Sequence, residues 1–329
     1  MAGYKARLER DLDRWIEDGL VPVRNREAML ASVADGRRVD ASVALAVIGA
    51  LLLGVAAVAF VAANWDVIPR LARFGLILSV FLAVVGAASW FSKDGTRPIL
   101  TNTLLSVAAL IYAGAIGLTG QIFDIAGDPQ RALRSAGLAA GLLALAGRSS
   151  GAGVAALALI CLGEFAGGFD KEESRWLIFA APVGMALAWL WNSKPLAHAS
   201  SVALIIGLIA VLALYEQTWG ASGLVAGGVV LGLLAGAARQ LSDRRTAVIF
   251  FLWFVWGALA LFAVGGFDDL KGAYLIAHRA AWLVVAGGVI ALGMHDRQGM
   301  VTAAGVVAII AGVCTILFDL GLGLMTAAG

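Results

Sequence analysis

Long apolar runs, each about twenty residues in length, follow one another from residue 41 onward and leave few folds open to this chain. A bilayer hydrocarbon core about 30 Å thick is crossed by about 20 helical residues, because each residue adds about 1.5 Å. We therefore predict transmembrane spans at residues 42–63, 70–91, 98–118, 130–147, 151–168, 175–192, 197–216, 219–238, 246–265, 278–294 and 300–320. The predicted fold class is all-α, a polytopic transmembrane helix bundle of about 10–11 spans. The segment 151–168 is short and rich in glycine, so a tilted or re-entrant segment is an alternative there.

The composition supports a membrane protein. Hydrophobic residues make up 61% of the 329 residues and charged residues only 14%, whereas a soluble domain carries about 25% charged residues. A soluble fold of this size would have too little polar surface to cover its apolar side chains. The net charge of +2 does not indicate nucleic-acid binding. Cys161 and Cys314 both lie inside apolar runs, so neither a disulfide framework nor a metal site is predicted.

The first 40 residues are mainly polar and predict two short amphipathic helices. The apolar residues of the first helix follow the i, i+4, i+7, i+8 spacing of one helical face: Leu8, Leu12, Trp15 and Ile16. Gly19 predicts its end, and a second helix is expected from Asn25, as N-cap, to Ala34. We predict two domains, a cytoplasmic amphipathic helical hairpin at 1–40 and a transmembrane helical domain at 41–329. The hairpin either binds a protein partner or the membrane surface, or packs on the protein's own cytoplasmic face.

The basic residues predict the orientation. Eight of the 24 Lys and Arg residues lie within the first 38 residues, and the others divide equally between the two sides of the predicted array. Cytoplasmic segments carry an excess of Lys and Arg in membrane proteins. The N-terminus is therefore expected in the cytoplasm, and this expectation depends on the N-terminal segment alone.

Polar residues near the ends of the first spans are the candidates for function, because ionisable groups at membrane depth are costly unless they face a partner or a cavity. The first group ends the first span, and the second follows the third span in the glycine-interrupted segment 117–128. Together they form a candidate polar pathway or buried polar site: Asn64, Trp65, Asp66, Thr119, Gln121, Asp124 and Asp128. Two interpretations of segment 117–128 are open. It is either an unwound segment that lines a cavity, or an ordinary loop in which Asp128-Pro129 starts the fourth span.

Three arginines near these carboxylates are possible ion-pair partners: Arg73, Arg131 and Arg134. The remaining polar groups inside spans are single, and they include Glu164 and Asp319. Gly223, Gly227, Gly228, Gly232 and Gly236 recur on one face of the span 219–238 and predict close packing of helices. No internal repeat is visible in the sequence.

The chain carries no recognisable catalytic motif. It lacks a zinc-protease His-Glu-x-x-His, a paired Cys-x-x-Cys, a Gly-x-Ser-x-Gly elbow and a nucleotide-binding P-loop. We therefore expect no catalytic residues, no metal and no cofactor. An intramembrane enzyme would need two carboxylates in register, and only Asp124 and Asp128 approach this arrangement.

Three segments occur in a fixed order along the chain: Leu12–Leu20 in the polar segment, Ala62–Asp66 with Pro69 and Arg73, and Gly120–Phe123 with Gly127-Asp128. In these segments the chain resembles the domain-of-unknown-function 2157 family of predicted bacterial membrane proteins. The resemblance covers about the first 145 residues. It implies a multi-pass protein of the bacterial inner membrane, and it does not imply a particular reaction.

These observations favour two functions. The first is a transporter- or channel-like protein whose polar site lies around spans one to four, with a small molecule or ion of unknown identity as substrate. The second is a membrane scaffold or accessory subunit that binds a partner through the N-terminal hairpin and the glycine-rich helix faces. In both cases the lipid bilayer surrounds the protein, and no nucleic-acid partner is expected.

Overall fold

A computed structural model describes residues 2–32, 68–93, 97–123, 127–167, 175–214, 216–241, 244–266 and 270–320, together with isolated helical positions between 45 and 63. The chain divides into two compact units, Met1–Ala59 and Phe60–Gly329, and each is described by itself. The predicted domain boundary at residue 40 lies outside the described residues and stays a prediction.

The first unit contains α1 (Ala2–Glu17), a 3₁₀ turn (Val23–Asn25) and α2 (Arg26–Ser32). The side chain of Leu12 on α1 is fully buried. Gly19 has a φ of +71°, and the Leu20 and Gly19 amides donate to the carbonyls of Trp15 and Ile16, so α1 ends in a Schellman motif at the predicted glycine. Arg26 Nε lies 2.8 Å from Asp13 Oδ1 and links α2 to α1. The hairpin over residues 1–40 extends beyond the described residues and stays a prediction.

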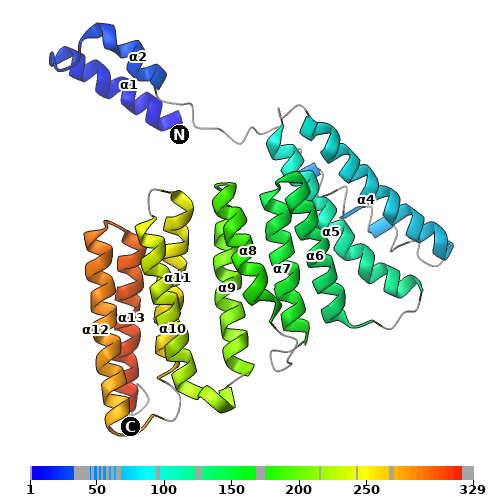
Figure 1. The fold of residues 1–329 in the computed structure, drawn as a ribbon. Helices are drawn as coiled ribbons and strands as arrows, with labels where there is room; N and C mark the ends of the chain where they lie inside the picture. Colours follow the sequence, from blue (N-terminus) through cyan, green and yellow to red (C-terminus); the bar gives the residue numbers. More distant parts are fainter. Residues whose placement is uncertain are drawn as a thin grey trace, which may run out of the picture. The chain divides into compact units, whose positions relative to one another are not determined.

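Helices form the described part of the second unit, as the apolar runs predict, and no strand occurs among the described residues (Figure 1). They are α4 (Arg70–Lys93), α5 (Pro98–Ile122), α6 (Pro129–Gly147), α7 (Ser150–Gly167), α8 (Trp176–Leu190), α9 (Lys194–Leu214), α10 (Glu216–Gln240), α11 (Arg245–Val264), α12 (Ala273–His295) and α13 (Gly299–Asp319). The all-α membrane-helix class is thereby confirmed.

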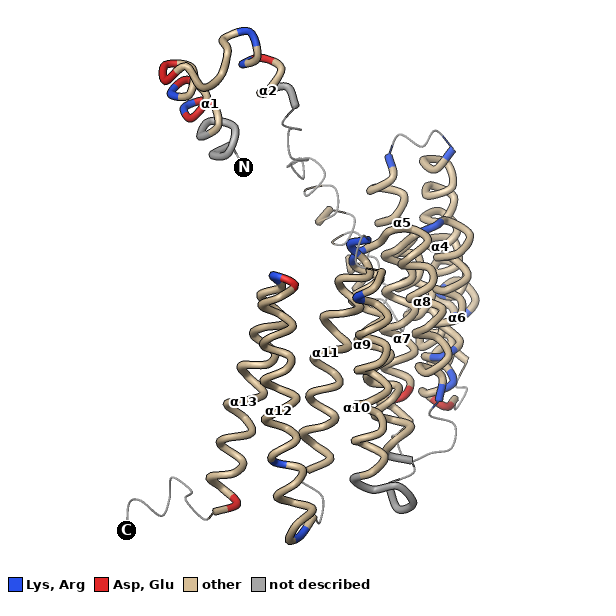
Figure 2. Tube along the Cα trace, turned by 60° about the vertical axis from the view of Figure 1, so that its left-hand side comes forward, with Lys and Arg blue, Asp and Glu red and all other residues tan. Residues whose placement is uncertain are grey.

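Eight of the described helices are long and apolar enough to cross a membrane. The helix α8 has only 15 residues, and the first turns of α6 carry Gln130, Arg131 and Arg134. The first predicted span, 42–63, lies largely outside the described residues, so the total of ten or eleven spans stays a prediction. The span predicted at 151–168, for which a tilted or re-entrant segment was the alternative, is the continuous helix α7, one of the eight candidate spans. Along these helices the charged residues gather mainly near the helix ends (Figure 2).

Consecutive helices pair as antiparallel hairpins, namely α4–α5, α6–α7, α8–α9, α10–α11 and α12–α13. The second helices of these hairpins pack in series, α5 on α7, α7 on α9, α9 on α11 and α11 on α13. The structure therefore contains a repeat that is not visible in the sequence. It is a repeat of the helical hairpin, which requires only apolar runs and turns and no recurring motif.

Three of the hairpins share one type of turn. Arg148, Asn192 and Arg297 adopt positive φ angles of 47°, 49° and 54° directly after α6, near the end of α8 and after α12. In each turn the next amide donates to a carbonyl five residues earlier, as in Ser149 to Ala144. This Schellman pattern satisfies the last carbonyls of the first helix and returns the chain within two or three residues.

The predicted glycine face of α10 is only partly a packing face. A Cβ atom at Gly227 would lie 2.9 Å from Leu212 Cδ1, and one at Gly228 would lie 3.0 Å from the Ala258 carbonyl oxygen. These two glycines permit the close approach of α9 and α11. Gly232 and Gly236 would meet nothing within 4 Å, so the prediction was wrong for them. They point away because four-residue spacing drifts around a helix with 3.6 residues per turn.

Candidate functional site

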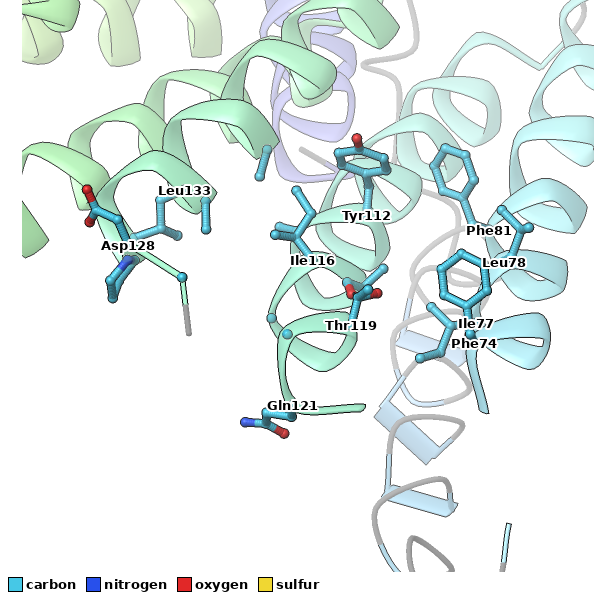
Figure 3. Close-up of a pocket in the computed structure, with 18 residues that line it drawn as sticks. Phe74, Ile77, Leu78, Phe81, Tyr112, Ile116, Thr119, Gln121, Asp128 and Leu133 are labelled. Atoms are coloured by element: carbon cyan, nitrogen blue, oxygen red, sulfur yellow. The ribbon is translucent and has the colours of Figure 1, made fainter. Parts of the chain in front are cut away.

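A pocket of about 1220 Å³ lies between α4, α5 and the start of α6 (Figure 3). Its α4 wall consists of Phe74, Ile77, Leu78 and Phe81. Its remaining apolar lining comes from α5 and α6 and includes Tyr112, Ile116 and Leu133. Three helices that are consecutive in the chain thus enclose a largely apolar space.

Aromatic side chains border the pocket between α4 and α5. Ala88, near the C-terminal end of α4, is the buried residue of this helix. Nearer its N-terminal end, α4 contacts α5 and the residue that follows it through two pairs of rings. The ring centroids are 5.7 Å apart for Phe81 and Tyr112 and 6.2 Å apart for Phe74 and Phe123. Phe74, Phe81 and Tyr112 are themselves lining residues of the pocket.

The polar residues of the pocket lie near the end of α5 and the start of α6. Thr119 and Gln121 come from the last turns of α5, and Asp128 precedes α6. The Thr119 hydroxyl donates to the Ala115 carbonyl at 2.7 Å. Asp128 Oδ1 accepts from the Gln130 amide at 2.9 Å, so Asp128 is the N-cap of α6 and Pro129 occupies its first turn.

The segment from Gly117 onward is therefore not unwound where it is described. The α5 helix continues to Ile122, four residues beyond the predicted span, and the Phe123 amide donates to the Thr119 carbonyl. Helical hydrogen bonding tolerates Gly117 and Gly120 because their neighbours are good helix formers. The interpretation in which Asp128-Pro129 starts the next helix is the one that the N-cap geometry matches.

The structure brings Thr119, Gln121 and Asp128 of the predicted site together at one pocket. Asn64, Trp65, Asp66 and Asp124 lie outside the described residues. Among the predicted partners, Arg73 Nε donates to the Ile68 carbonyl at 2.7 Å. Arg131 Nε lies 3.5 Å from Asp128 Oδ2 in a largely exposed pair.

Arg134 has a buried partner that the sequence did not indicate. Its Nε and Nη2 atoms donate to Glu164 Oε1 of α7 at 3.1 and 3.0 Å, and both side chains are buried, with 6% and 1% exposed. The guanidinium also lies 5.8 Å from the centroid of the Trp176 ring on α8. The Arg134 guanidinium of α6 thus contacts residues of both α7 and α8.

Glycines on α7 make room for this polar cluster. A Cβ at Gly163 would lie 3.3 Å from Arg134 Cγ, and one at Gly167 would overlap the Gln130 side chain. Gln130 is 2% exposed, and its Nε2 atom has no hydrogen-bond partner among the described residues. The sequence could have indicated the Arg134–Glu164 pair, because antiparallel packing of α6 and α7 places the start of α6 beside the end of α7.

A second ion pair, between buried Arg279 and partly exposed Asp319, joins α12 and α13. Arg279 Nε donates to Asp319 Oδ2 at 2.8 Å. Next to it, His278 Nε2 lies 2.9 Å from the Phe262 carbonyl near the end of α11, and the two rings stack with centroids 4.7 Å apart. Because a carbonyl only accepts, the ring carries its hydrogen on Nε2. Asp319, which was predicted to be a polar group without a partner, is therefore paired with Arg279.

Among the residues that the structure describes, no group of three or more His, Cys, Asp or Glu side chains is placed to hold a metal ion. The described pocket offers largely apolar walls, the hydroxyl groups of Tyr112 and Thr119, the amide of Gln121 and the carboxylate of Asp128. These groups suit the binding of a molecule with a large apolar part and a small polar end.

A search of curated proteins found no match, and a search of solved structures found none. A family model matches residues 13–153, a range that includes α4, α5 and α6 and hence every helix that lines the pocket. Residues 13–153 match the model of the family described as Predicted membrane protein (DUF2157), so the resemblance is confirmed over this part of the chain.

Proposed function

We propose that this protein is a transporter-like membrane protein whose substrate pathway passes through the pocket between α4, α5 and α6. The single observation that carries the proposal is that Thr119, Gln121 and Asp128, the members of the candidate polar pathway that the structure describes, all line this pocket. Asn64, Trp65, Asp66 and Asp124 are proposed as further members of the same pathway.

The size of the pocket supports this function. Protein interiors are packed as densely as organic crystals, and voids larger than a water molecule are few. A space of about 1220 Å³ between candidate membrane helices is therefore expected to hold lipid, water or a ligand. Ligand sites in proteins have comparable volumes, about 300–1,000 Å³. Polar residues at one end favour a specific occupant over bulk lipid.

Cysteine labelling in sealed vesicles tests the pathway without knowledge of the substrate. In a Cys161→Ser, Cys314→Ser background, Thr119→Cys and Gln121→Cys are treated with a membrane-impermeant maleimide. Thiols react as thiolates and so require water. Both variants are expected to be labelled, whereas Gly114→Cys, on α5 outside the pocket, is expected to stay unlabelled. If Thr119→Cys reacts no faster than Gly114→Cys, no aqueous pathway reaches the pocket and the proposal fails.

The same vesicles test the proposed location in the bacterial inner membrane with the N-terminus in the cytoplasm. The turn after α12 would then be cytoplasmic, together with the turns after α6, α8 and α10. Arg297 is exposed in its turn, so Arg297→Cys should be labelled in inside-out vesicles and protected in intact cells. Labelling in intact cells would reverse the orientation.

A scaffold role is the second candidate, because the N-terminal unit exposes apolar side chains. Leu20 and Val23 are each 71% exposed and Trp15 is 38% exposed. Exposed apolar groups that lie close together are typical of interaction surfaces. A scaffold would lose a stable partner in pull-down experiments when residues 1–36 are deleted, and retention of every partner after this deletion would exclude the role.

A further inference from the structure

We infer that the pocket binds an amphipathic cation, a molecule with an aliphatic chain and an ammonium head group. This inference rests on the proposed function, because it names the class of substrate for the same site. It follows from the distribution of apolar and charged groups along the pocket.

The apolar part of the pocket fits an aliphatic chain. Phe74, Ile77, Leu78 and Phe81 form a continuous stripe on α4, with i, i+3, i+4 and i+7 spacing. Tyr112 faces this stripe from α5, whereas Ile116 points toward Leu133 on the α6 side of the pocket (Figure 3). A chain between these two walls would replace empty space by dispersion contacts along its whole length.

The charged part of the pocket fits a cation. Asp128 is the only charged residue among the lining residues that the structure describes. Its Oδ1 atom accepts the N-cap hydrogen bond, whereas its Oδ2 atom lies 3.5 Å from Arg131 Nε, beyond good hydrogen-bond length. The Asp128 side chain is 45% exposed, so a ligand cation can approach Oδ2 in competition with Arg131.

The identity of the head group follows from these contacts. An ammonium group beside Asp128 would gain Coulomb attraction at the edge of a low-dielectric pocket. The Gln121 and Thr119 oxygens near the same end accept hydrogen bonds from a primary ammonium. A sulfate or phosphate head would meet the repulsion of the same carboxylate. The described lining contains no basic side chain, and Arg131, which pairs with Asp128, is 74% exposed and is not one of the lining residues.

Binding of tritiated dodecyltrimethylammonium to the full chain in phosphatidylcholine nanodiscs tests the inference, with empty nanodiscs as background. Two glycines of α5 provide a matched pair of variants. Gly117 lines the pocket and Gly114 does not, and a Cβ at either position would meet nothing within 4 Å. Gly117→Trp is therefore expected to abolish saturable binding, and Gly114→Trp is expected to preserve it.

The charge is tested by Asp128→Asn, since asparagine is an equally good N-cap and should leave α6 intact. We expect the affinity for the cation to fall about tenfold, as for loss of a partly solvated ion pair. Unlabelled dodecyl sulfate should compete poorly with the wild type. Primary dodecylammonium should compete at least as well as the labelled probe.

The outcomes separate this inference from the proposed function. If Gly117→Trp abolishes binding while Asp128→Asn has no effect and dodecyl sulfate competes equally, the pocket binds the aliphatic chain without selecting a cationic head group. The inference of a cation is then wrong. The labelling of Thr119→Cys would still support a pathway. If the probe shows no saturable binding, or if both tryptophan variants bind it equally, the pocket does not take amphipathic cations.

Discussion

Replacing Glu164 by glutamine keeps the size of the side chain and removes its charge, and we expect this change to be among the most destabilising in the protein. Both members of the Arg134–Glu164 pair are nearly inaccessible, with 6% and 1% of their side chains exposed, and two guanidinium nitrogens reach one carboxylate oxygen. Removing one partner from a buried pair costs about 3–5 kcal/mol, because the remaining charge is poorly solvated. We expect Glu164→Gln to lie in this range.

The Arg131–Asp128 pair offers a matched control on the same helix. Its side chains are 74% and 45% exposed and its nitrogen–oxygen distance is 3.5 Å. Exposed pairs contribute about 0–1 kcal/mol, so Arg131→Gln should change the free energy of unfolding by less than about 1 kcal/mol. The double variant Arg134→Met, Glu164→Leu removes both charges, and we expect it to recover most of the loss.

The assay is reversible unfolding of the purified protein in mixed detergent micelles, followed by circular dichroism. The free energy of unfolding is compared among the wild type, Glu164→Gln, Arg131→Gln, the double variant and its two single changes, Arg134→Met and Glu164→Leu. If Glu164→Gln costs no more than Arg131→Gln, the pair is not buried from solvent as the structure indicates. If the double variant loses as much as the sum of its single changes, the two residues do not act as a pair, and the argument from charge burial is refuted.

Three further predictions concern other contacts. Asn102 Oδ1 accepts from the Ser149 hydroxyl and the Gly151 amide at 2.8 and 3.0 Å, so Asn102→Ala should cost about 1–3 kcal/mol of unfolding free energy in the same assay. Gly228→Ala should destabilise by about 1–3 kcal/mol because its Cβ would press on the Ala258 carbonyl, whereas Gly232→Ala should be neutral or stabilising. Hydrogen bonds from Arg239 lower the pKa of Asp296. The stability from this pair is therefore present above the unfolded-state value of about 3.9 and lost as the pH falls through the lower folded-state pKa. Asp296→Asn should reduce this loss in unfolding measured between pH 5 and pH 3, and an unchanged pH dependence would contradict it.

The helices were predictable where hydrophobicity alone determines them. The span expected at 246–265 is α11, Arg245–Val264, and the expected 300–320 is α13, Gly299–Asp319. The errors occur where polar residues lie inside a helix. The span expected at 278–294 begins five residues earlier, at Ala273. His278 and Arg279 lower the local hydropathy there, yet they are buried through contacts with α11 and α13. An apolar run in the sequence marks the part of a helix that faces lipid. The helix itself can extend further, because its backbone hydrogen bonds continue through polar residues whose side chains have partners.

The candidate site was predictable only in its local part. Thr119, Gln121 and Asp128 are close in sequence, so their position at one helix connection follows from the chain itself. The opposing wall on α4 depends on how α4 and α5 pack against each other, and the sequence does not show which side chains meet between these two helices. The partner of Arg134 is 30 residues away, and its identity requires knowledge of which helices pair. A simple geometric rule would have narrowed the choice. In consecutive antiparallel spans, a charge near the start of one helix and an opposite charge near the end of the next lie at the same depth.

The family match covers the helices that line the pocket, but not most of the helices that pack behind them in the series. Residues 13–153 include the whole described lining of the pocket, but the match ends in the first turn of α7. Glu164 lies beyond that point, and it holds Arg134 on the face of α6 adjacent to the pocket lining residue Leu133. The α7 helix in turn packs on α9, and the series continues to α13. The hairpins outside the matched region therefore contribute to the pocket indirectly. They pack against α7, and Glu164 of α7 pairs with Arg134 of α6, the third helix that lines the pocket.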